Sequence, residues 1–165
     1  MKRNSVCWNI TSRCNENCRF CYRIMCTKEN TYEQNDRILD LLIELKIDKI
    51  TWTGGEALLY PHLFDLMKKA HYNNIKNNII TNGKLLNPNI IDEIEEYTDH
   101  ITLSLDSLDD NVNDCLGRGI EHSKHILELM EYLKNKDIIL KLNSVVTKQN
   151  VNNINEIAQV VSIYK

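Results

Sequence analysis

The feature that most limits the folds open to this chain is a regular alternation of strand and helix patterns along nearly its whole length. Short β-type runs occupy residues 5–11, 49–53, 77–81, 101–105 and 138–146. Apolar residues at helical spacing predict helices at 32–46, from Pro61, at 90–97, at 121–136 and from Asn150 onward. Strands separated by helices usually join as right-handed βαβ units, so the sequence predicts an α/β fold with a parallel sheet.

One face of the predicted strands is polar, although strands of a parallel sheet are normally apolar on both faces. The residues of this face are Cys7, Asn9, Thr11, Thr51, Thr53, Thr102, Ser104, Lys141 and Asn143. The opposite face carries Val6, Trp8, Ile10, Ile50, Trp52, Ile101, Leu103, Leu105, Leu140 and Leu142. A polar face that no helix covers predicts a sheet curled into a partial barrel around a polar ligand. A Rossmann-like sheet with a few buried threonines is the alternative, and Lys141 argues against it because lysine is almost never buried unpaired.

Charge and hydropathy argue against two classes of partner. A chain of 165 residues is long enough for one domain with its own core. The net charge of −3 gives no broad basic surface for nucleic acid, and no apolar run is long enough to cross a membrane. The first residues lack the apolar stretch and cleavage site of a signal peptide. We therefore expect a cytoplasmic protein that binds neither nucleic acid nor membrane.

Three cysteines, Cys14, Cys18 and Cys21, follow directly after the first predicted strand. Six cysteines in a cytoplasmic chain favour metal or redox chemistry over disulfides. Loops after strands form the active face of a parallel α/β barrel, and three thiolates there can hold one soft metal centre. In an iron–sulfur cluster this set would leave one iron open. A structural zinc site is the alternative, because Cys7 or Cys26 could supply a fourth ligand; Cys115 stands apart and is given no role.

Four motifs, in order along the chain, resemble those of the radical S-adenosylmethionine (SAM) superfamily. They are CNENCRFC at residues 14–21, Gly54-Gly55-Glu56 after the second strand, Thr81-Asn82-Gly83 after the third and Leu103-Ser104-Leu105-Asp106 on the fourth. The resemblance covers nearly the whole chain and implies a partial (β/α)6-type TIM barrel. Residues 1–165 would then be the N-terminal part of a radical SAM core domain with about five βα units, and the rest of the barrel and a substrate cap would lie beyond it.

The resemblance also implies how a 4Fe–4S cluster and SAM would be held. Cys14, Cys18 and Cys21 would each bind one iron, and the amino and carboxylate groups of SAM would bind the fourth. The SAM amino group would meet the motif at residues 54–56, where glycine permits close approach of the backbone and the carboxylate of Glu56 matches an ammonium.

Four further residues are expected around SAM by the same resemblance. Phe20 would lie near the adenine, Asn82 within the SAM site, and Ser104 near the ribose or the carboxylate. Arg118 would pair with that carboxylate as a planar, bidentate donor. The simpler alternatives are that Ser104 is an ordinary hydrogen-bonded residue and that Arg118 is solvated.

The reaction implied by the family starts with one electron passing from the reduced cluster to SAM. SAM then breaks into methionine and a 5′-deoxyadenosyl radical, which abstracts a hydrogen atom from the substrate. The cofactor supplies the reactivity and the protein supplies position and exclusion of water, so no residue is expected to be a catalytic acid or base. An electron donor such as flavodoxin or ferredoxin is implied as a partner.

Two segments resemble the viperin-type nucleotide dehydratases within this superfamily, in their soluble prokaryotic form. They are residues 106–119 and the strand Lys141-Leu142-Asn143-Ser144-Val145. These lyases convert a nucleoside triphosphate to its 3′-deoxy-3′,4′-didehydro form, which serves antiviral defence. The likeness implies that Lys141 and Asn143 hold the nucleotide, since a lysine suits a triphosphate. Ala57 departs from the proline that many family members have.

Three alternatives stay open at this point. Radical SAM enzymes that modify peptides, or that act in molybdenum cofactor synthesis, share the pattern of the fifth strand more loosely. A protein of another class, an iron–sulfur redox or sensor domain without turnover, would need the cluster alone. Lys141 could also pair with a nearby acid such as Asp106 instead of a ligand.

Overall fold

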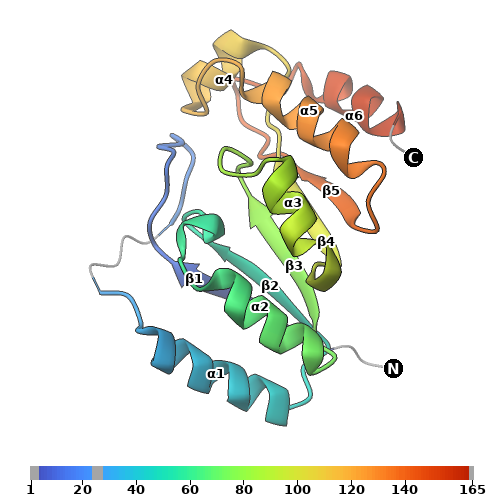
Figure 1. The fold of residues 1–165 in the computed structure, drawn as a ribbon. Coiled ribbons are helices and arrows are strands. Elements are labelled where there is room, and N and C mark those ends of the chain that lie inside the picture. The colour runs from blue at the N-terminus through green and yellow to red at the C-terminus, as the bar shows by residue number, and fades with distance from the viewer. Residues whose placement is uncertain (1–3, 24–27, 164–165) are drawn as a thin grey trace.

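The computed structural model describes residues 4–23 and 28–163 and confirms the alternation of strands and helices (Figure 1). The strands are β1 (Ser5–Thr11), β2 (Lys49–Gly54), β3 (Lys76–Thr81), β4 (His100–Ser104) and β5 (Ile139–Asn143). The α-helices are α1 (Tyr32–Glu44), α2 (Leu63–Tyr72), α3 (Pro88–Ile94), α4 (Asp110–Leu116), α5 (His122–Leu133) and α6 (Ile154–Ile163). Two short 3-10 helices, η1 (Ala57–Leu59) and η2 (Glu95–Tyr97), follow β2 and α3. Within the described ranges, no helix has the length and apolar character needed to span a membrane.

All five strands form one parallel sheet in the order β1-β2-β3-β4-β5. Each strand therefore pairs with the next one along the chain, which is the order of a barrel wall and not of a doubly wound Rossmann sheet. The register places Thr102 beside Lys141 and Ser104 beside Asn143, so these side chains share one face, as predicted. We call this polar side the lumen face.

The opposite face of the sheet packs against the helices, and α2 and α3 lie over it in Figure 1. Trp52, Ile79, Ile101 and Leu103 are buried there at 0–1% exposure, because alternate residues of each strand point toward the helices. The lumen face is much more open, and Asn9, Lys141 and Asn143 are exposed on it. The predicted division into an apolar and a polar face is therefore present.

Asn77 is a polar residue on the helix side that the sequence reasoning did not foresee. It is fully buried, and its Oδ1 accepts a hydrogen bond of 2.7 Å from Trp52 Nε1. Its Nδ2 donates to the backbone oxygens of Met67 at 2.9 Å and Tyr97 at 2.8 Å. All polar atoms of the side chain are thus used, which removes the cost of burying it and ties α2 and η2 to the sheet.

The end of the fifth predicted strand was wrong by three residues. β5 ends at Asn143, because Val145 N donates to Asp106 Oδ1 at 2.8 Å and draws the chain out of the sheet. The last helix begins at Ile154 and not at Asn150. Asn150 is instead fully buried and donates to the backbone oxygens of Asp106 at 2.8 Å and Val145 at 2.9 Å.

Helix α4 was not predicted, although its end signals are present in the sequence. Asp109 caps its start by accepting from the backbone N–H groups of Asn111 and Val112. Gly117 ends it in the left-handed region, at φ 87°. The helix is only seven residues long, too short for a clear apolar period.

Candidate active site

The residues expected to hold the cluster and SAM line one cavity of about 150 Å³ where the chain leaves the strands. Its lining includes Cys14, Cys18, Phe20, Cys21, Gly54, Gly55, Glu56, Asn82, Ser104 and Arg118. They come from the loop after β1, the ends of β2 and β4, and the loops after β3 and α4, so the fold brings together residues up to 104 positions apart in sequence. Lys141 and Asn143 are not part of this lining and lie on the lumen face of β5.

The cluster loop, residues 12–21, is held on one side by the start of the glycine motif. Gly55 N donates to Thr11 O and Glu56 N donates to Arg13 O, both at 2.8 Å, which continues the pairing of β1 and β2 into the loops. A Cβ atom on Gly54 would lie 2.3 Å from Thr11 O, and one on Gly55 would lie 2.2 Å from Arg13 O. Glycine is therefore required at these two positions because the backbone of the cluster loop lies directly against them.

The end of α4 holds the cluster loop on its other side. Arg19 N donates to Leu116 O at 3.0 Å, and a Cβ on Gly117 would lie 2.4 Å from Asn17 O. Backbone contacts thus hold the cluster loop on both sides.

The three thiols of the loop surround the cavity without meeting at one point. In the parts of the chain that the structure describes, no three His, Cys, Asp or Glu side chains are close enough to share a single metal ion. Three soft thiol ligands spread around a common cavity suit a multi-iron cluster, which lies between the cysteines that bind it. The three cysteines therefore fit the 4Fe–4S cluster that the sequence implied. Cys26, considered as a fourth zinc ligand, lies outside the described residues, and Cys7 is exposed on β1.

Burial has a clear effect on Cys18. It raises the pKa of this thiol to about 12, the positive charge of Arg118 opposes the rise, and Glu16 adds to it. Cys18 Sγ lies 3.4 Å from Glu16 Oε2. The thiol is therefore protonated in the metal-free protein at neutral pH, and binding a metal there must displace a proton.

Glu56 accepts hydrogen bonds that connect the segment after β2 with the end of β3. Its carboxylate is 1% exposed and accepts from Thr81 Oγ1 at 2.8 Å, Asn82 N at 2.8 Å and Leu58 N at 3.2 Å. Burial raises the pKa of Glu56, and these donors partly offset the rise. Two carboxylate oxygens offer about four acceptor positions, so three donors leave room for an ammonium group.

Arg118 is buried and ion-paired, which rules out the solvated alternative. Its Nη1 lies 2.6 Å from Glu16 Oε2 and its Nε lies 2.8 Å from Asp106 Oδ2. Its guanidinium also stands 5.5 Å from the centre of the Phe20 ring. Asp106 is thus the partner of Arg118, and no ion pair joins it to Lys141 in the described part of the chain.

Glu16 and His122 were missed by the sequence reasoning. Both side chains are 1% exposed, and Glu16 Oε1 lies 3.8 Å from His122 Nδ1 and 3.4 Å from Lys84 Nζ. Burial lowers the pKa of His122, so its ring is neutral at pH 7. Glu16 pairs with an arginine 102 residues away, and no local pattern could have indicated that contact.

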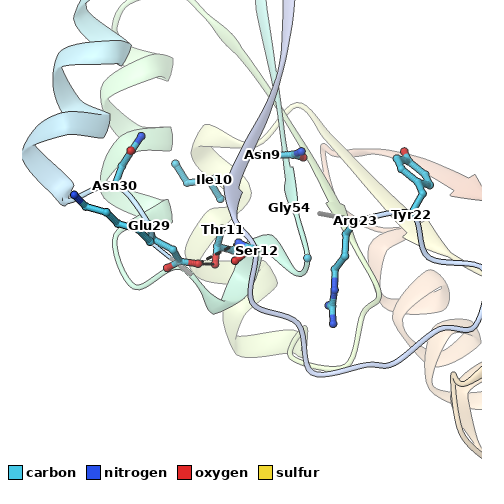
Figure 2. Close-up of a pocket in the computed structure, with 11 residues that line it drawn as sticks. Asn9, Ile10, Thr11, Ser12, Tyr22, Arg23, Glu29, Asn30 and Gly54 are labelled. Atoms are coloured by element: carbon cyan, nitrogen blue, oxygen red, sulfur yellow. Dashed lines mark hydrogen bonds between the residues drawn. The ribbon is translucent and has the colours of Figure 1, made fainter. Parts of the chain in front are cut away.

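A second cavity, of about 370 Å³, adjoins the first at Arg23, Gly54 and Gly55 (Figure 2). In Figure 2, Arg23 and Tyr22 lie on one side of β1, and Glu29 lies on the other. Glu29 accepts hydrogen bonds from Thr11 Oγ1 and, at 3.1 Å, from Ser12 N, and it pairs with Arg13 at 3.2 Å. These contacts anchor the start of the cluster loop from outside the sheet.

The lumen face carries a basic hollow of about 490 Å³ at the opposite end of the strands. It is lined by Ser5, Asp48, Lys49, Asn74, Lys76, His100, Ile139 and Lys141. Burial, followed by the charge of Lys141, lowers the pKa of His100. The buried Nδ1 of His100 has no hydrogen-bond partner among the described residues. Three lysines, the acid Asp48 and an unpaired ring nitrogen therefore line one space, and Lys76 Nζ lies 3.8 Å from Asp99 Oδ1.

Between the hollow and the cluster loop lies a layer of hydrogen-bonded polar side chains. Asn78 Nδ2 donates to Thr51 Oγ1 at 3.3 Å, and Thr102 Oγ1 donates to Asn78 Oδ1 at 3.1 Å. Asn78 was not among the residues predicted for the polar face. Polar side chains thus continue along the lumen face from the hollow to the cluster loop.

A family model described as the radical SAM superfamily matches residues 8–161. An S-adenosylmethionine-dependent nucleotide dehydratase from Flammeovirga pacifica is 33% identical, over 90% of this chain and 55% of its own length. A nucleotide dehydratase named RSAD2 from Oncorhynchus mykiss is 28% identical, over 90% of this chain and 45% of its own length. This chain thus spans about half the length of these relatives.

Solved structures share the fold at lower identity. Streptococcus suis SuiB bound to S-adenosylmethionine matches with a TM-score of 0.81 and 22% identity, over 95% of this chain and 37% of that one. A structure of anSMEcpe with bound AdoMet matches with a TM-score of 0.75 and 18% identity, over 96% of this chain and 48% of that one. These likenesses support the parallel, partial-barrel architecture.

Proposed function

Because this chain belongs to the radical SAM superfamily, we propose that its protein cleaves SAM reductively at a 4Fe–4S cluster and acts on a nucleoside triphosphate. Cys14, Cys18 and Cys21 would hold the cluster. Support for the nucleotide comes from relatives named nucleotide dehydratases at 33% and 28% identity. The product in this proposal is a 3′-deoxy-3′,4′-didehydro nucleotide, and the reductant is a protein such as flavodoxin or ferredoxin.

The observation that carries the choice of substrate is the basic hollow below the cluster loop. Lys49 lies in the hollow and Thr53 lines the cluster cavity, four residues further along β2. At about 3.3 Å per residue this distance is roughly 13 Å, which suits a sugar and an extended triphosphate between the two ends. Lys49, Lys76 and Lys141 would meet the phosphates, and Asn143, one lumen-face position above Lys141, would donate to the phosphate or the sugar.

The side chains around the cluster loop have separate tasks in this proposal. When bound, a reduced cluster would supply the one electron needed for the reductive cleavage of SAM. Glu56 and the Gly54-Gly55 backbone receive the SAM amino group, and Arg118 faces its carboxylate. Phe20 packs near the adenine, Asn82 lines the SAM site and Ser104 meets the ribose. These contacts orient SAM and exclude water, so hydrogen abstraction needs no acid or base from the chain.

The test uses the full-length protein, reconstituted anaerobically with iron and sulfide. ATP, CTP, GTP and UTP are each added with SAM and dithionite, and 5′-deoxyadenosine is measured. One nucleotide should stimulate its formation at least tenfold. Lys141→Ala should abolish the stimulation and leave the slow, substrate-free cleavage of SAM. Lys124→Ala, a lysine exposed on α5, is the matched control and should behave as the unaltered protein.

Three results would contradict this proposal in different ways. If a peptide stimulates cleavage and no nucleotide does, the peptide-modifying alternative is correct. If a nucleotide stimulates equally in Lys141→Ala, the lumen lysine does not bind substrate. If iron is incorporated but 5′-deoxyadenosine never forms, the chain is a redox or sensor domain.

A further inference from the structure

Glu16 is a buried acid in the middle of the cluster loop, between the first two cysteines of the motif. Its side chain is 1% exposed, and its Oε2 accepts a hydrogen bond of 2.6 Å from Arg118 Nη1. A buried carboxylate is unfavourable unless it is paired and hydrogen-bonded, so the contact with Arg118 is what allows Glu16 to lie inside. Among the described residues, breaking that contact would leave Glu16 with only the more distant Lys84 Nζ as a cationic partner, 3.4 Å from its Oε1, and Arg118 with only Asp106 as an anionic one.

Arg118 also connects Glu16, through Asp106, to two other loops. Its Nε lies 2.8 Å from Asp106 Oδ2, and Asp106 Oδ1 accepts from Val145 N at 2.8 Å. The series Glu16, Arg118, Asp106 and the backbone of Val145 therefore joins the cluster loop to the segments after β4 and β5. We call this series the loop clamp.

The loop clamp acts at a point of the cluster loop that backbone hydrogen bonds leave open, where Asn82 Nδ2 also donates to Asn15 Oδ1 at 2.7 Å. Backbone bonds hold the loop at Thr11 and Arg13 on one side, and at Arg19 on the other. Glu16 lies between these anchors, beside the Cys18 thiol at 3.4 Å. Glu16 is thus in a position to constrain the placement of Cys14 relative to Cys18.

We propose that Glu16 is a positioning residue that holds the three-cysteine loop in its ligating shape before the iron–sulfur cluster is bound. The proposal rests on the proposed function only in taking the three cysteines as cluster ligands. The pairing with Arg118 orders the loop in advance, so less conformational entropy is lost when the cluster assembles. Glu16 also lines the cluster cavity, and its role in this proposal is exerted through the shape of the loop.

The first experiment needs no metal. Hydrogen exchange is measured on the metal-free, full-length protein and on its Glu16→Ala and Glu16→Gln variants. In Glu16→Ala the amides of residues 12–21 should exchange at least tenfold faster, with the amides of β3 unchanged. Glu16→Gln keeps an oxygen that can accept from Arg118 and should restore most of the protection. Glu128→Gln, an exposed acid on α5, is the control.

The second experiment follows cluster assembly. With iron and sulfide, Glu16→Ala should gain cluster absorbance several-fold more slowly than the unaltered protein, although all three cysteines are present. Unchanged exchange in residues 12–21 would overturn the proposal. So would faster exchange throughout β3 and β4, since Glu16 would then support the fold as a whole. If the unaltered protein takes up no iron, the proposed function fails, and the exchange experiment still decides whether Glu16 orders the loop.

Discussion

At the scale of single residues, the site shows how burial and pairing set the state of an ionisable group. Cys18 is half-buried beside a carboxylate, and its thiol pKa rises to about 12 despite the nearby guanidinium of Arg118. A thiolate is the reactive and metal-binding form, so the metal-free protein keeps this position unreactive.

We expect the alkylation of Cys18 in the metal-free protein to rise about tenfold per pH unit from pH 8 to pH 11. With a thiol pKa of about 12, the thiolate stays a minor species over that range. Iodoacetamide labelling followed by mass spectrometry of the peptide would measure the rate. A rate that levels off near pH 9 would contradict the raised pKa.

The same raised pKa has a consequence for stability. The folded state keeps the proton of Cys18 up to about pH 12, whereas the unfolded chain loses it near pH 9. The contribution of this group is therefore intact below pH 9 and is lost progressively between pH 9 and pH 12. Cys18→Ala should flatten the fall in urea midpoint of the metal-free protein between pH 9 and pH 10.5.

Glu56 allows a further prediction, because its two oxygens accept from two different backbone N–H groups. Oε1 faces Leu58 N and Oε2 faces Asn82 N. In Glu56→Gln, whichever way the amide is turned, its NH2 group meets one of these donors. We expect a loss of about 1–3 kcal/mol in the free energy of unfolding of the metal-free protein, measured by urea titration. A gain in stability would mean that the cost of the buried charge outweighs the lost acceptor.

At the scale of elements, the short helix α4 supports the cluster loop through its last residues. Gly117 and Gly119 provide a matched pair, since both have φ values in the left-handed region, 87° and 85°. A Cβ on Gly117 would lie 2.4 Å from Asn17 O, whereas one on Gly119 would have nothing within 4 Å. The two positions therefore share the backbone strain and differ in the contact.

Gly119→Ala should cost about 1–2 kcal/mol of unfolding free energy, from the left-handed backbone alone. Gly117→Ala should cost more and should also lower the iron content after reconstitution, because the cluster loop must move to admit the methyl group. Urea titration and iron analysis would measure the two effects. Equal losses in both variants would show that the contact with Asn17 does not matter.

At the scale of the whole molecule, the sheet separates a packed helix side from an open lumen side. Two neighbouring asparagines lie on these two sides. Asn77 is fully buried and bonds to Trp52 and to two backbone oxygens on the helix side. Asn78 faces the lumen and bonds to Thr51 and Thr102. The same residue type at adjacent positions thus has two different roles.

We expect Asn77→Ala to destabilise the protein by about 2–5 kcal/mol, because it leaves a cavity and several buried polar atoms without partners. Asn78→Ala should cost about 1 kcal/mol or less, since water can reach the lumen face and replace the lost bonds. Urea unfolding of both variants gives the comparison. A larger loss for Asn78→Ala would place the main core on the lumen side.

Local signals in the sequence were sufficient for much of the fold and for most of the candidate site. Strand and helix periods determined the alternation, and residue order along alternating strands determined the polar face that holds Ser104, Lys141 and Asn143. The cysteine loop and the residues at 54–56 are contiguous motifs at strand ends, and parallel pairing brings such ends to one edge. These features depend on neighbours in the chain, which a sequence displays directly.

Tertiary structure alone decided the contacts between distant segments. The pairing of Glu16 with Arg118 spans 102 residues, the burial of Asn77 depends on two helices meeting, and the early end of β5 follows from a bond to Asp106. Each is a polar group whose burial is favourable only because a specific partner is present. A sequence shows that such a group exists, whereas packing decides which partner satisfies it.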